Sequence, residues 1–123
     1  MPWSVVFDDA FEAEFTRLPL RVQDELLASA KLLARFGPYL GRPHADALNG
    51  SAFANMKELR FAADGGIWRV AFAFDPARMA VLLVAGDKSG GGEKRFYRTL
   101  IARADARYRA WLARHGAGTK GRP

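Results

Sequence analysis

The sequence predicts one α+β domain, a small and mainly antiparallel sheet with helices packed on one face. Three observations lead to this prediction. Apolar residues alternate around a glycine turn near the middle, they recur at helical spacing before and after it, and a short β-like run lies near the start. The expected order is β-α-α-β-β-β-α. A chain of 123 residues has the length of a single domain, which we place at residues 1–115, followed by a disordered basic tail at 116–123.

The first part of the chain indicates a strand followed by two helices. Residues 3–7 are a short β-like run, and Asp8 or Asp9 after it can cap a helix. From Ala10 to Phe36 the apolar residues recur at helical spacing, but Pro19 interrupts them. Because proline favours the first turn of a helix, we expect a second helix to begin there.

The remaining elements flank a central hairpin. Gly37-Pro38 ends the preceding helix, and residues 39–54 lack a sustained period and are expected to form a loop. The unbroken apolar run Met79–Ala85 is typical of a strand covered on both faces. After a glycine-rich loop at Gly86–Gly92, an apolar stripe over Glu93–His115 predicts the last helix.

The hairpin, within Met56–Phe74, is the most informative part of the sequence. Large apolar residues alternate there with polar or small ones, which indicates strands with one buried face. Asp64-Gly65-Gly66 is the signal of a tight turn between the strands. Whether Asp64-Gly65 or Gly65-Gly66 forms the turn, Arg60 and Arg69 fall on one face, opposite the aromatic residues. Arginine's planar fork binds two phosphate oxygens at once, so this face predicts a rigid cationic site for phosphate.

Composition restricts the class of protein. The net charge of +6 attracts polyanions, such as nucleic acid or an acidic partner protein, although charge for solubility alone is the simpler alternative. The absence of cysteine excludes a disulfide scaffold, a thiolate zinc site and a cysteine nucleophile, and it fits a cytoplasmic protein. The N-terminal residues lack the basic segment of a signal peptide, and no apolar run approaches the ~20 residues of a membrane span, so no membrane partner is expected.

Several segments carry a family resemblance. They are Asn55–Phe61, Gly66–Asp75, Gly86–Gly90 and, in the last helix, Phe96-Tyr97-Arg98 with Ile101, Ala104-Asp105 and Tyr108. Together with the order of elements, over residues 3 to 113, these segments resemble the RelE/ParE-type bacterial toxins, and among them the HigB-like, phage-derived branch.

This resemblance implies a RelE-like domain that acts as the toxin of a type II toxin–antitoxin pair. Family members typically cleave mRNA on the ribosome, which inhibits translation, and a cognate helix-turn-helix antitoxin silences them. Other members of the superfamily poison gyrase, so the fold alone leaves two alternatives open. These are a non-enzymatic inhibitor of the same fold and a basic RNA-binding module without turnover.

Metal-independent cleavage of RNA uses the 2′-hydroxyl as nucleophile, and it needs a base, cations around the phosphate and an acid for the leaving oxygen. The sequence has no cluster of His, Asp and Glu with metal-ligand spacing, so we expect no metal and no other cofactor. His44 is the candidate base because imidazole titrates near neutral pH, whereas His115 lies beside the tail. If His44 is not used, Arg, Lys and Tyr must supply the catalysis, as the resemblance implies.

The catalytic candidates are cationic or acid–base side chains on or near the arginine face: Arg60, Arg69, Lys88, His44 and Tyr97. The two arginines could instead form weak surface ion pairs. Lys88 follows the buried strand at the end where it could reach the arginine face. Tyr97 lies on the apolar stripe of the last helix, where core packing is the alternative to a role in the site.

The candidates for RNA binding are further cations around this face: Lys57, Lys94, Arg95 and Arg98. Strict alternation turns Lys57 away from the arginine pair, which argues against it unless the strand begins later. Arg95 and Arg98 belong to a very basic helix. That helix could hold ribosomal RNA or an acidic antitoxin segment, or be a solvated face without a partner.

Overall fold

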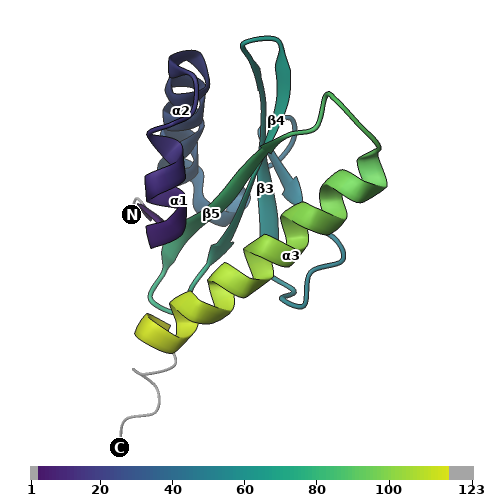
Figure 1. Ribbon diagram of the computed structural model, residues 1–123. Coiled ribbons are helices and arrows are strands. Elements are labelled where there is room, and N and C mark those ends of the chain that lie inside the picture. Colours follow the sequence, from purple (N-terminus) through teal and green to yellow (C-terminus); the bar gives the residue numbers. More distant parts are fainter. Residues whose placement is uncertain (1–2, 117–123) are drawn as a thin grey trace, which may run out of the picture.

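The computed structural model describes residues 3–116, which form a sheet with helices on both of its faces (Figure 1). The main elements in chain order are β1 (Ser4–Phe7), α1 (Asp9–Phe15), α2 (Leu20–Phe36), β2 (Ala45–Ala47), β3 (Met56–Ala63), β4 (Gly66–Phe74), β5 (Met79–Asp87) and α3 (Glu93–Trp111). Short helical turns follow α2 at Gly37–Tyr39 and α3 at Leu112–Gly116. The described helices include none long and apolar enough to cross a bilayer.

The sheet has five strands in the order β1-β5-β4-β3-β2. Every neighbouring pair is antiparallel except β1 and β5, which run parallel. The prediction of an α+β domain with a mainly antiparallel sheet is therefore confirmed. The order differs by one element, because β2 lies in the segment predicted as a loop and pairs with β3. A three-residue edge strand is too short to show an alternating pattern in the sequence.

The local signals in the sequence explain where the first elements begin and end. The carboxylate of Asp8 accepts the backbone N–H of Phe11 at 3.1 Å and so caps α1. Pro19 occupies the N-cap of α2, as predicted. The turn between β3 and β4 is formed by Asp64 and Gly65, whose φ angles of 52° and 78° fit a two-residue hairpin turn.

The prediction that helices pack on one face of the sheet is wrong. One buried cluster joins α1 and α2 to side chains such as Val70 and Phe72, and a second joins α3 to the alternate residues, among them Ala71 and Ala73. All four of these β4 residues are fully buried. Alanines leave room for a helix to approach closely, but they carry little hydrophobic signal of their own, so the sequence pattern shows only the face with large side chains.

Arg107 of α3 forms hydrogen bonds with both α1 and β5. Its Nη1 and Nη2 donate to the Glu14 carboxylate of α1 at 2.9 and 2.6 Å, and Nη1 also donates to the Leu83 carbonyl at 2.8 Å. This bidentate hydrogen bond lowers the pKa of Glu14 and raises that of Arg107, although partial burial opposes both shifts. A carboxylate whose pKa is lowered by folding stabilises the folded state above its unfolded pKa, and this stabilisation is lost as the pH falls through the folded value.

Arg107→Ala is therefore expected to lower the free energy of unfolding by about 1–2 kcal/mol at neutral pH. The loss should shrink as the pH falls from 4.5, the ordinary pKa of glutamate, through the lowered pKa of Glu14 in the folded protein. Below that value Glu14 is protonated in both proteins and only the contact with the Leu83 carbonyl still differs. Urea unfolding of both proteins at neutral and acidic pH measures this loss in the free energy of unfolding. An equal loss at both pH values would mean that the ion pair contributes nothing.

Candidate functional site

Arg60 and Arg69 lie directly opposite each other in the register of β3 and β4. The adjacent pairs, Leu59 with Val70 and Phe61 with Trp68, alternate with them, and Leu59 and Val70 belong to the cluster beneath α1 and α2. Because successive side chains of a strand point to opposite faces, both arginines lie on the α3 side. The prediction that they share a face opposite the aromatic residues is confirmed.

Arg69 is not an open surface residue, because the start of α3 covers it. Only 6 % of it is exposed, and its Nε donates to the hydroxyl oxygen of Tyr97 at 3.2 Å. Its Nη1 donates to the Trp68 carbonyl at 2.9 Å. Arg60, with 23 % of its side chain exposed, is the more accessible of the two. The guanidinium of Arg60 is therefore accessible to solvent, whereas that of Arg69 is buried.

Glu58 completes the cluster and was not among the predicted site residues. It is 3 % exposed, and its Oε2 accepts Nη1 of Arg60 at 2.7 Å. Its Oε1 lies 3.9 Å from Nε of Arg69 and has no hydrogen-bond partner among residues 3–116. The sequence did carry a signal for it, because alternation puts Glu58, two residues before Arg60, on the same face.

Tyr97, in the first turns of α3, and Lys88, just after β5, complete this cluster. Burial raises the pKa of the Tyr97 hydroxyl, and Glu58 adds to the rise while Arg69 opposes it. Tyr97 is therefore a protonated hydrogen-bond donor at neutral pH. Lys88 places its ammonium 5.9 Å from the centroid of the Tyr97 ring and 3.3 Å from Oε1 of Glu93. The structure thus brings together Arg60, Arg69, Lys88 and Tyr97.

An open cleft of about 510 Å³ leads to this cluster. It lies between the β2 edge and the first turns of α3, and its lining includes Arg60, Glu58, Tyr97 and Lys94. Arg42 stands at its rim, paired with Asp46 at 2.9 Å. The cleft is lined by three cations, three carboxylates (Asp46, Glu58 and Glu93) and the phenol of Tyr97. Among these groups, the arginine fork and the phenol are the ones that can bind a phosphodiester.

His44 approaches the arginines from a different side. Its backbone carbonyl accepts the N–H of Arg60 at 2.8 Å, while the exposed residue lines a separate hollow of about 450 Å³ with residues of α2. Atoms of Arg60 and Arg69 also line that hollow, but Tyr97 does not. His44 is near the cluster without lining the cleft in which Tyr97 lies.

The predicted RNA-binding residues are dispersed. Lys94 lines the cleft, whereas Lys57 pairs across the sheet with Phe72 and so lies on the opposite face from the arginine pair. Arg95 lines a second hollow, on the other side of the start of α3, and Arg98 is exposed on the same helix. Within residues 3–116, no group of three or more His, Asp and Glu side chains is arranged to hold a metal ion.

Comparisons with known proteins agree with the resemblance carried by the sequence. Residues 13–109, which include every candidate residue above, match the family described as "Phage derived protein Gp49-like (DUF891)". A Mycobacterium tuberculosis protein named "Putative toxin HigB3" is 54 % identical over 88 residues, which cover 71 % of this chain and 75 % of that protein.

A second Mycobacterium tuberculosis protein, named "Putative toxin HigB2", is 42 % identical over 89 residues. The match covers 72 % of this chain but 44 % of that protein, so this chain spans less than half the length of that relative. No solved structure matches the chain. The family match and the identity to these relatives lead to one conclusion: the chain belongs to the phage-derived, Gp49-like protein family.

Proposed function

We propose that this protein is the toxin of a type II toxin–antitoxin pair and that it cleaves mRNA on the ribosome, in the cytoplasm and without a metal. The names of its relatives support the toxin assignment. The observation that carries the cleavage assignment is the cluster of Arg60, Arg69 and Tyr97 around a buried carboxylate, at a cleft that Arg60 and Tyr97 line. A cognate helix-turn-helix antitoxin is the expected partner, and it would block a cationic surface of this kind.

In the proposed reaction, the 2′-hydroxyl of the RNA attacks the adjacent phosphorus. The new 2′-O–P bond forms as the bond to the 5′-oxygen breaks, which leaves a cyclic 2′,3′-phosphate and a 5′-hydroxyl. Negative charge grows on the phosphoryl oxygens during this step, and preorganised cations stabilise it. Arg60 can bind there because Glu58 occupies only part of its fork of N–H donors.

Tyr97 is suited to the acid side of this reaction. Its raised pKa keeps the hydroxyl protonated, so it can donate a hydrogen bond to a phosphoryl oxygen or to the leaving 5′-oxygen as negative charge develops there. Arg69, hydrogen-bonded to that hydroxyl, holds it in place. Glu58 acts as a positioning residue, because its carboxylate lies between the two guanidinium groups and fixes their separation.

The proton of the 2′-hydroxyl requires an acceptor. His44 is the proposed base, and it would reach the RNA from the hollow on the α2 side, which atoms of Arg60 and Arg69 also line. His44→Gln is expected to lower cleavage by about 10²–10⁴-fold. Cleavage rates of the two proteins measure this effect. The matched control is His115→Gln, which makes the same change in the helical turn that follows α3. Unaltered activity in His44→Gln would assign catalysis to the Arg, Lys and Tyr side chains alone.

Induced expression in a bacterial host tests the proposed function as a whole. We expect growth arrest, with mRNA cut inside translated codons, and relief of the arrest when the antitoxin is co-expressed. Total RNA and plasmid topology should be followed in the same culture. Intact mRNA together with a change in DNA supercoiling would favour the gyrase-directed alternative, and intact mRNA with no such change would favour a binding module without turnover.

A further inference from the structure

The second half of β5 has an open edge. β1 pairs with β5 only from Met79 to Leu82, and α1 then carries the chain away. Beyond Leu82, β4 is the single described strand that pairs with β5. Arg107 covers the carbonyl of Leu83, so the open stretch begins after that contact. An exposed strand edge is a template on which another chain can add a strand.

Along this edge, the backbone N–H and C=O groups of successive residues point alternately toward β4 and outward. The N–H of Lys88 donates to the carbonyl of Ile67, which shows that Lys88 faces β4. Because backbone groups alternate from side to side along a strand, Gly86 also faces β4, while Ala85 and Asp87 face outward. Each of these two residues offers one N–H donor and one carbonyl acceptor to an additional strand.

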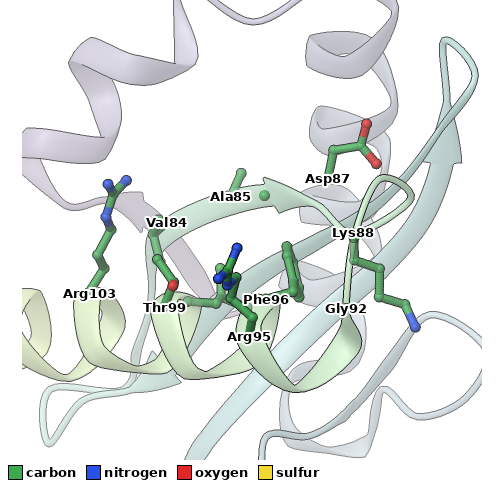
Figure 2. Close-up of a pocket in the computed structure, with 12 residues that line it drawn as sticks. Val84, Ala85, Asp87, Lys88, Gly92, Arg95, Phe96, Thr99 and Arg103 are labelled. Carbon is green, nitrogen blue, oxygen red and sulfur yellow. The ribbon is translucent and has the colours of Figure 1, made fainter.

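A hollow of about 350 Å³ runs beside this edge (Figure 2). Its floor is apolar and comes from Val84, Phe96 and Leu100. The close contact between β5 and α3 depends on Gly86, since a Cβ there would lie 2.8 Å from the Phe96 ring. Such a floor has room for one apolar side chain of a bound peptide.

The walls of this hollow are cationic. Arg95 and Arg103 extend from α3 toward the strand (Figure 2), and no ion pair holds either guanidinium within the described part of the chain. Asp87 also lines the hollow, and the hydrogen bonds that it accepts from Ser89 and Ile67 lower its pKa, so it keeps its negative charge. The lining cations Lys88, Arg95 and Arg103 outnumber this one carboxylate, so the net charge that faces a ligand is positive.

We propose that the outer edge of β5, at Ala85–Asp87, binds an extended acidic segment of a partner protein as an additional strand. The backbone of that segment would pair with Ala85 and Asp87, an apolar side chain would enter the hollow, and acidic side chains would face Arg95 and Arg103. Single-stranded RNA would meet the same cations, but it has no regular pattern of donors and acceptors to match a strand.

Charge also distinguishes between the possible sources of the segment. A second copy of this chain carries the same excess of positive charge, and its residues 116–123 contain Lys120 and Arg122 but no acid. An acidic segment of a different protein is therefore the occupant that the surface fits. This proposal does not depend on RNA cleavage, because it rests on the β5 edge and the far side of α3.

The test uses the full chain and a short peptide, Glu-Thr-Val-Thr-Glu, in which the valine and both glutamates fall on one face of an extended strand. Titration by calorimetry, together with amide chemical shifts, should show binding with the largest shifts at Ala85 and Asp87. The same peptide with N-methylated backbone amides keeps its charge but cannot pair as a strand, and its affinity should be at least about tenfold weaker, which corresponds to ~1.4 kcal/mol. Equal affinity for both peptides would overturn the proposal.

Two substitutions in the protein, rather than in the peptide, test the same surface. Ala85→Pro removes the outward N–H donor, a change that an edge position tolerates, and Arg103→Glu reverses one wall charge. Both should weaken peptide binding about tenfold or more. Lys31→Glu makes the same charge reversal on exposed α2 and should leave affinity unchanged. If Arg103→Glu and Lys31→Glu weaken binding equally, or if an RNA oligomer shifts these amides and the peptide does not, the proposal is wrong.

Discussion

Replacing Arg69 by alanine is expected to lower mRNA cleavage by about 10²–10³-fold, the usual cost of removing one donor that stabilises transition-state charge. The physical reason is twofold. The substitution removes a guanidinium beside the proposed phosphate position, and it releases the Tyr97 hydroxyl that Arg69 holds at 3.2 Å. Arg69→Lys keeps the charge but loses the planar fork, so it should recover only part of the activity.

The same substitution should also reduce stability, and by more than the position of Arg69 on the strand alone would suggest. A residue that faces away from the aromatic core would be expected to alter stability by no more than about 0.5 kcal/mol. Arg69 is buried, however, and its loss leaves Oε1 of the buried Glu58 without its nearby cation. The expected loss is roughly 1–3 kcal/mol in the free energy of unfolding.

Arg107→Ala is the control that separates these two effects. It should destabilise the protein to a similar degree while leaving the cleft intact, since Arg107 contacts Glu14 and the Leu83 carbonyl. Urea unfolding and single-turnover cleavage should be measured on both variants at a temperature where both are folded. If Arg69→Ala cleaves as well as Arg107→Ala, Arg69 has no role in the reaction.

Phe72→Asp is expected to prevent folding altogether. Phe72 is fully buried in the cluster beneath α1 and α2, with its ring 5.5 Å from that of Phe74. Removing a buried phenylalanine side chain costs about 3–5 kcal/mol, and a buried unpaired carboxylate costs more, which together approach the whole stability of a small domain. Circular dichroism and urea unfolding measure the result. Phe72→Leu keeps the site apolar and should fold, whereas a folded Phe72→Asp protein would contradict the core assignment.

The fold was predictable where the sequence signal is local and strong. Alternation from Met56 to Phe74 gave the hairpin, Asp64-Gly65 gave its turn, and the shared face of Arg60 and Arg69 followed from the parity of the strands. The packing of α3 did not follow. Alternation distinguishes two faces but does not show which helix covers the face with small residues, and Ala71 and Ala73 do not indicate by themselves that they are buried.

The candidate site was predictable to a smaller extent, for the same reason. Arg60, Arg69, Lys88 and Tyr97 meet because α3 crosses above the hairpin, and no local pattern specifies that crossing. Glu58 was not among the predicted site residues, because its burial depends on the helix that packs over it. Lys57 faces away from the arginine pair, as alternation requires.

The central claim is that this cleft cleaves mRNA on the ribosome, and purified translating ribosomes test it most directly. The protein is added to ribosomes engaged on a labelled message, and the RNA ends are mapped at single-nucleotide resolution. The account predicts cuts within translated codons, a cyclic phosphate on the upstream fragment, a 5′-hydroxyl on the downstream fragment, and loss of these products with Arg69→Ala. Full-length mRNA in the presence of folded, ribosome-bound protein would contradict it.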